Sequence, residues 1–143
     1  MNVIWFDGLL QQRQDAGIYF LPETDLDELA EATAVNRFAC LRVDLRGCED
    51  KAGLLEKFAD QLPLPPHFGR NWDALADALG DLRAGDAAGV VLVLEHSGAL
   101  RRAASADFKR AMEVVQGACR EWAGRGVPFW AFVVLPDAEF EAL

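Results

Sequence analysis

Runs of apolar residues mark the strands of this chain. Phe38–Leu45 alternates between apolar and charged side chains from its fourth residue onward, which is typical of a strand with one buried face. Val90–Leu94 and Phe129–Leu135 are continuously apolar, as strands covered on both faces of a parallel sheet are. Val3–Phe6 and Gly17–Leu21 are further candidates near the N-terminus, and the sequence leaves open whether either adds a strand to the sheet.

Helical periodicity fills the segments between these strands. Thr24, Asp50 and Ser105 are predicted N-caps because short polar side chains accept hydrogen bonds from the first turn of a helix. Gly124 and Gly126 are expected to end the last long helix. The predicted helical segments are Asp25–Thr33, Lys51–Gln61, Asn71–Leu82, the short Ser97–Ala104 and Ala106–Ala123.

This order of elements predicts an α/β fold. Its centre is a small, mainly parallel sheet of three strands with helices packed on it, extended by one N-terminal strand if a candidate there pairs with the edge. The length of 143 residues and the apolar content of 52% suit a single domain with one core.

The stretch Leu64–Leu82 combines a proline-marked turn with an amphipathic helix whose other side is acidic. Asp73 and Asp77 lie one turn apart, where like charges repel and slightly destabilise a helix. One interpretation is an ordinary solvated face, and the other is a set of carboxylates presented to a basic cleft. Four residues form the apolar side of this helix, Trp72, Leu75, Ala76 and Leu79.

Composition favours a basic partner. Lys and Arg total 14 and Asp and Glu total 23, for a net charge of −9, so the phosphates of nucleic acids and anionic lipids repel the chain. Direct binding to nucleic acid or to a membrane is therefore not expected. The sequence shows neither a signal peptide nor an apolar run of about 18 residues, which predicts a cytoplasmic location.

Cofactor and metal chemistry find no support in the sequence. It contains no GxGxxG or GxxxxGK[ST] phosphate loop, and its two histidines and three cysteines lack metal-ligand spacing. An odd cysteine count without a CxxC pair fits a reducing compartment. Cys40 and Cys119 fall on apolar patterns and are predicted to be packed as small hydrophobic residues.

A small hydrolase is the enzymatic alternative. His96 and Ser97 follow the apolar run Val90–Leu94, where sites of α/β proteins often lie. Adjacency in sequence does not make a nucleophile and its base, because the two side chains must meet in space. No GxSxG elbow is present, so the sequence favours a loop role for these residues and no catalytic activity.

The segment LPPHFGRNWDALADAL, with VLVLE after it and a final REW…RGVPFWAFVVLP, resembles the barstar family of ribonuclease inhibitors. The resemblance covers roughly the last hundred residues. It implies that residues 38–143 form a barstar-like domain, that residues 1–37 are an N-terminal extension packed on it, and that the two make one domain overall. It also implies a cytoplasmic inhibitor that blocks the active site of a basic ribonuclease.

The resemblance further implies which residues meet the partner. Asp77 matches the aspartate that enters the enzyme's phosphate-binding pocket, and Asp73 matches the acidic contact beside it. Glu121 matches a further acidic contact on the long helix. Gly69 and Asn71 match the loop that supports the start of the acidic helix and adds contacts.

Three positions depart from the family pattern. His67 stands where the family has a tyrosine that touches the enzyme, Ala76 where tryptophan is frequent, and Arg70 where an acidic residue occurs. The partner is therefore expected to differ from the standard ribonuclease. A different basic nuclease toxin, or a basic partner that is not a nuclease, remains the alternative.

Overall fold

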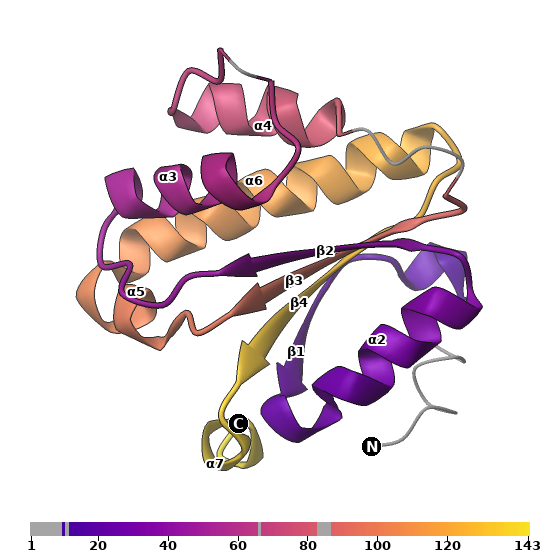
Figure 1. Ribbon diagram of the computed structural model, residues 1–143, viewed down its shortest axis with the longest axis horizontal. Coiled ribbons are helices and arrows are strands. Elements are labelled where there is room, and N and C mark those ends of the chain that lie inside the picture. Colours follow the sequence, from indigo (N-terminus) through magenta and orange to yellow (C-terminus); the bar gives the residue numbers. More distant parts are fainter. Residues whose placement is uncertain (1–9, 11, 66, 83–86) are drawn as a thin grey trace.

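A parallel sheet of four strands, covered by helices on both faces, forms the centre of the computed structural model (Figure 1). The structure describes residues 10, 12–65, 67–82 and 87–143. The α/β class and the parallel sheet are confirmed. Its strands are β1 (Ile18–Pro22), β2 (Ala39–Asp44), β3 (Val90–Glu95) and β4 (Phe129–Leu135), in the order β1-β4-β3-β2.

The predicted number of three strands is wrong, because β1 pairs in parallel with β4, with Ile18 opposite Ala131. β1 is only five residues long, and its partner lies more than a hundred residues away, so no local pattern shows the pairing. The other N-terminal candidate, Val3–Phe6, lies outside the described residues.

The helices follow the predicted segments closely. The acidic tail adds a short helix, α7, which contacts β1. The helices are α2 (Leu26–Val35), α3 (Lys51–Gln61), α4 (Trp72–Gly80), α5 (Gly98–Ala103), α6 (Ser105–Gly124) and α7 (Asp137–Glu141), with single 3-10 turns at Arg13–Asp15 and Glu23–Asp25.

Side-chain caps fix the starts of α3 and α4. The Asp50 carboxylate accepts a hydrogen bond from the Gly53 N–H at 2.7 Å, as predicted. The Asn71 side chain accepts one from the Ala74 N–H, also at 2.7 Å, so Asn71 is the N-cap of α4 and not its first residue. Just after α6, Gly126 has a φ of 79°, which glycine adopts without strain.

Two predicted caps are wrong. Thr24 lies within the turn Glu23–Asp25, and the cap position of α2 is Asp25, which makes no side-chain cap hydrogen bond. Ser105 is the first residue of α6, whose cap position is Ala104. In both cases a preceding helical turn runs almost into the next helix, and this shifts the boundary by a residue.

Burial on both faces explains the continuous apolar runs of β3 and β4. Alternate residues of these strands enter a core under α3, α4 and α6, or a second core under α2. The strands contribute Val43, Leu92, Leu94, Phe129 and Val133 to the first core, and Leu21, Val91, Val93, Trp130 and Phe132 to the second.

The direction in which the chain crosses the sheet decides which helix covers which face. From β2 the chain steps to β3 and then to β4, and right-handed crossovers place α3 to α6 on one face. From β1 it crosses the sheet in the opposite direction to reach β2, so the same handedness places α2 on the other face (Figure 1). The segment before residue 38 therefore supplies both the fourth strand and the cover of the second face.

The cysteines divide between the core and the surface. Cys48 and Cys119 are buried, and burial raises the pKa of the Cys119 thiol to about 11. The prediction that Cys40 is packed is wrong, because this residue is exposed. Cys40 lies on the edge strand β2 opposite Val91, whose side chain belongs to the second core, so Cys40 is on the face of the sheet that α2 covers but at its edge.

Candidate functional site

The acidic side of α4 is exposed and, within the described residues, free of ion pairs. Leu75, Ala78 and Leu79 bury the opposite side of the helix in the first core. Asp73 and Asp77 are both exposed, and neither forms an ion pair with another residue in the described part of the chain. The helix is thus held by its apolar side while two carboxylates stay available to solvent.

Two hollows flank α4 and divide the predicted contact residues between them. The hollow between α4 and α6, of about 290 Å³, is lined by Asp73, Ala76 and Glu121 among others. The hollow on the other side, of about 210 Å³, is lined by His67, Gly69, Asp77 and other residues of the loop and helix. Asn71 is the N-cap of α4. We call Asp73, Asp77 and the two hollows beside them the α4 surface.

The loop before α4 is anchored at one residue and strained at another. Phe68 is buried in the first core, whereas His67 and Gly69 are exposed on either side of it. Arg70 has a φ of 52°, an uncommon conformation for a residue with a Cβ. Its Nε–H donates to the Glu56 carboxylate on α3 at 2.9 Å, so the guanidinium is held toward α3.

Glu121 differs from the two aspartates because it is already paired. Arg125, one turn along the chain, donates to the Glu121 carboxylate at 2.8 Å and to the Gly80 carbonyl at the end of α4 at 2.7 Å. The guanidinium also lies 4.7 Å from the centre of the Trp122 ring, and the Trp122 Nε1–H donates to the Leu79 carbonyl at 2.9 Å. These contacts tie the last turn of α4 to the end of α6.

Gly80 makes this close approach possible. A Cβ at that position would lie 2.7 Å from a Glu121 carboxylate oxygen. Sequence reasoning missed Gly80, Trp122 and Arg125 as supports of the α4 surface. The spacing of Glu121 and Arg125 by four residues was the one available signal, since such pairs face each other on a helix.

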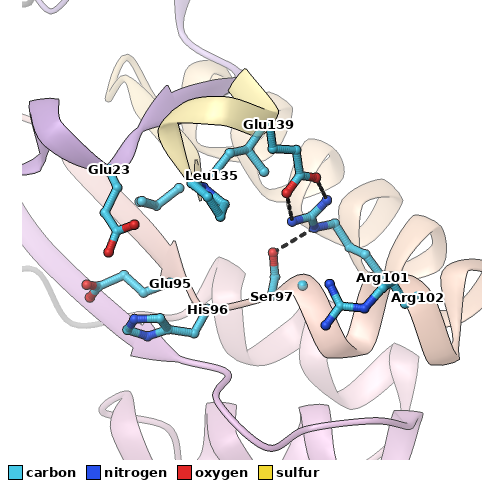
Figure 2. Close-up of a pocket in the computed structure, with 11 residues that line it drawn as sticks. Glu23, Glu95, His96, Ser97, Arg101, Arg102, Leu135 and Glu139 are labelled. Carbon is cyan, nitrogen blue, oxygen red and sulfur yellow. Dashed lines mark hydrogen bonds and ion pairs between the residues drawn. The ribbon is translucent and has the colours of Figure 1, made fainter. Parts of the chain in front are cut away.

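A second group of polar side chains lies where the strands end. Figure 2 shows the pocket at this edge, which we call the carboxyl-edge pocket. The pocket has a volume of about 100 Å³. It is lined by Glu23 after β1, by Glu95, His96, Ser97 and Gly98 at and after the end of β3, by Arg101 and Arg102 of α5, by Val134, Leu135 and Pro136 at the end of β4, and by Glu139 of α7.

His96 and Ser97 do not form a nucleophile and base. One ring nitrogen of His96, Nε2, lies 3.0 Å from an Arg46 guanidinium nitrogen, and the other, Nδ1, lies 2.9 Å from Asp44. Because arginine only donates, Nε2 accepts, and Nδ1 carries the proton that Asp44 accepts. Ser97 instead accepts from the Arg101 Nε–H at 3.0 Å. The hydrolase alternative therefore lacks the contact on which it depends.

The hydrogen bonds at this edge shift two carboxyl pKa values downward. The backbone N–H of Arg46, followed by His96, lowers the pKa of Asp44. The bidentate Arg101 guanidinium lowers the pKa of Glu139. Both carboxylates are therefore held in the charged form, which is the form that ties these loops together.

Two kinds of site find no match in the described part of the chain. No three histidine, cysteine, aspartate or glutamate side chains there are grouped as a metal would require. None of the described helices has the length and apolar character of a membrane span.

Comparison with known proteins finds that most of this chain matches one protein family. Residues 38–134 match the family model of Barstar, described as the barnase inhibitor. The match covers more than half of the chain and includes α4, the loop before it and the end of α6. A search of curated proteins finds no match.

Proposed function

We propose that this chain, which belongs to the Barstar family of barnase inhibitors, inhibits a basic ribonuclease of the barnase type by covering its active site with the α4 surface. The observation that carries the proposal is that Asp73 and Asp77 are exposed and outside every ion pair of the described residues, on a helix fixed by its apolar side. Charged groups held ready in this way lose little conformational entropy when they meet a partner.

Each predicted residue has a role in this proposal. Asp77 enters the phosphate-binding pocket of the enzyme, where its carboxylate takes the place of a substrate phosphate. Asp73 and Glu121 line the hollow between α4 and α6 and bind basic side chains of the enzyme. His67 and Gly69 contact the enzyme from the loop beside Asp77.

The remaining two predicted residues support the binding surface and need not contact the enzyme through a charge. Asn71 holds the first turn of α4 through its hydrogen bond from the Ala74 N–H. Ala76 leaves the hollow between α4 and α6 open, so the partner can place a side chain there.

The charge of the chain supports the same partner. A net charge of −9 attracts a basic protein over several ångströms and raises the association rate, most strongly at low salt. Such an inhibitor protects the cell that makes the ribonuclease, so we expect the chain in the cytoplasm. The proposal requires no cofactor.

The test measures RNA cleavage by a barnase-type ribonuclease at increasing concentrations of the chain. Wild type is expected to inhibit, and Asp77→Ala to raise the inhibition constant about 30-fold or more, because it leaves the partner's buried charges unpaired. Asp27→Ala is the matched control, since Asp27 is an exposed aspartate of α2 on the opposite face of the sheet. Equal inhibition by Asp77→Ala and wild type would reject the role of α4.

A basic partner that is not a ribonuclease is the second candidate. It is favoured by the loop before α4, where His67 stands in place of a tyrosine and Arg70, which pairs with Glu56, stands in place of an acidic residue. Here the chain would leave every barnase-type ribonuclease active. It would still bind a basic protein in a way that Asp73→Ala and Asp77→Ala abolish and Asp27→Ala does not.

A further inference from the structure

The carboxyl-edge pocket lies at the point where the sheet reverses its winding. After β1 the chain turns to the face covered by α2, and after β3 it turns to the face covered by α5 and α6. β4 lies between these two strands, so the loops diverge on either side of its end. Crevices of this kind, outside the carboxyl ends of parallel strands, are where α/β proteins bind small ligands.

Most of the charges in the pocket wall are neutralised by other residues. Arg101 pairs with Glu139 through two guanidinium nitrogens, and its Nε–H is held by Ser97. Glu95 receives two hydrogen bonds of 2.9 Å from Arg42 on β2. These pairs hold the side chains of the pocket wall in place.

Two charges of opposite sign remain outside these pairs. Neither Glu23 nor Arg102 forms an ion pair with another described residue, although Arg102 is near enough to help lower the pKa of Glu139. In Figure 2 Glu23 lies on one side of the pocket and Arg102 on the other. A side chain at Gly98 would come within 3.0 Å of an Arg102 guanidinium nitrogen, so the bare glycine leaves room for that guanidinium at the pocket.

Ser97 supplies a buried donor between these charges. Only 1% of its surface is exposed, and its oxygen accepts from the Arg101 Nε–H. The Ser97 oxygen thus has a partner, but no acceptor for its hydroxyl proton is found among the described residues. Ser97 lines the pocket, so its hydroxyl can donate to a ligand there.

We propose that the carboxyl-edge pocket binds a small zwitterion, an α-amino acid with a short aliphatic side chain. The ligand's carboxylate lies between Arg102 and the Ser97 hydroxyl, and its ammonium group faces Glu23. Its side chain rests on the aliphatic wall formed by Val134, Leu135 and Pro136. This site is separate from the α4 surface and does not depend on the proposed inhibition.

The charges of the wall select this class over simpler ligands. An anion alone would leave Glu23 unpaired beside a second carboxylate, Glu95. A cation alone would leave Arg102 and the Ser97 hydroxyl unpaired. The volume of about 100 Å³ restricts the ligand to a small molecule.

The test is calorimetric titration of the full chain with glycine, L-alanine and L-valine. Acetate and methylammonium, each carrying one of the two charges, are titrated in parallel. At least one amino acid is expected to bind at least tenfold more tightly than either singly charged compound. Arg102→Gln and Glu23→Gln are each expected to weaken this binding about tenfold or more, as hydrogen bonds to charged groups predict.

Arg110→Gln and Glu31→Gln are the matched controls, because both residues are exposed and lie outside the pocket. Both controls are expected to bind as wild type does. Three results would each overturn the proposal: no heat with any amino acid at millimolar concentration, acetate binding as tightly as the amino acids, or unchanged affinity in Arg102→Gln and Glu23→Gln. The four substituted residues are exposed, so all four variants are expected to stay folded, and a change in affinity reports on binding.

Discussion

The α4 surface and the carboxyl-edge pocket are both rich in charge, but most of the charges in the pocket are paired with other side chains, whereas the two aspartates of α4 are not paired with any described residue. On α4, Asp73 and Asp77 belong to no ion pair of the described residues and are held in place by the buried side of their helix. At the edge of the sheet, hydrogen-bonded pairs connect β2, β3, α5 and α7. Unpaired charges on a rigid element are available for binding, whereas paired charges mainly hold loops together. Substitutions in the two regions should therefore act on different quantities.

The largest effect is expected for Asp77→Ala in the complex with a basic ribonuclease. Loss of the carboxylate costs about 2–5 kcal/mol of binding, or roughly 30- to 4,000-fold in the dissociation constant. The free energy of unfolding of the free chain is expected to stay level or to rise by about a few tenths of a kcal/mol, because alanine favours a helix and the repulsion from Asp73 is lost. Urea unfolding and inhibition assays on one preparation measure both values. A clear loss of stability would mean that Asp77 has an internal role.

The next largest effect is expected for Arg101→Ala, which should lower stability and leave inhibition unchanged. Arg101→Ala removes the partner of Glu139 and Ser97, and the arginine side chain is only 20% exposed. We expect a loss of about 1–2 kcal/mol in the free energy of unfolding and unchanged inhibition of the ribonuclease. The adjacent Arg102→Ala is the control, with a change within about 0.5 kcal/mol. Equal stability of the two variants would show that the pairs at this edge do not stabilise the fold.

A smaller effect concerns pH. The pKa of Asp44 is lowered in the folded chain, so its contribution to stability is present above the ordinary aspartate pKa of about 4 and is lost as the pH falls through the lowered value. The side chain is about half exposed (47%), so the contribution is below about 1 kcal/mol. Asp44→Asn should therefore lose less stability than wild type between about pH 6 and pH 3. Asp60→Asn, an exposed aspartate of α3, should follow the wild-type curve, and a parallel curve for Asp44→Asn would contradict the assignment.

The smallest effect is expected at the contact between α4 and α6. The methyl group of Gly80→Ala displaces the Glu121 carboxylate, and the exposed Glu121–Arg125 pair contributes only about 0.3–0.5 kcal/mol. The gain in helix propensity from glycine to alanine is of similar size, about 0.5–1 kcal/mol, so the free energy of unfolding should change by less than about 0.5 kcal/mol. A loss above about 2 kcal/mol in urea unfolding would show that neither the Glu121 side chain nor α4 can move to make room for the methyl group.

The sequence predicted those features that depend on local patterns. The continuous apolar runs of β3 and β4, the cap at Asp50 and the outward position of Asp73 and Asp77 follow from periodicity and side-chain chemistry over a few residues. The position of the α4 surface was also accessible, because one amphipathic helix carries its two carboxylates.

Features that depend on distant pairing were not accessible. The fourth strand requires β1 to lie beside β4, and the exposure of Cys40 depends on β2 lying at the edge of the sheet. The contact of Arg125 with the Gly80 carbonyl needs the packing of α4 on α6. The same holds for the carboxyl-edge pocket, which joins the ends of three strands with two helices.

The pairing of β1 with β4 has a consequence for the order in which the chain folds. β1 leaves the ribosome first among the described strands, but its partner is the last to be made. Until β4 emerges, β1 has no strand to join, and α2 has no complete sheet face to cover. Contacts between such distant segments slow folding, because a long loop must close before they form. Before β4 has emerged, the nascent chain therefore exposes an unpaired strand and an apolar helix face, and this is the stage at which chaperones would matter most.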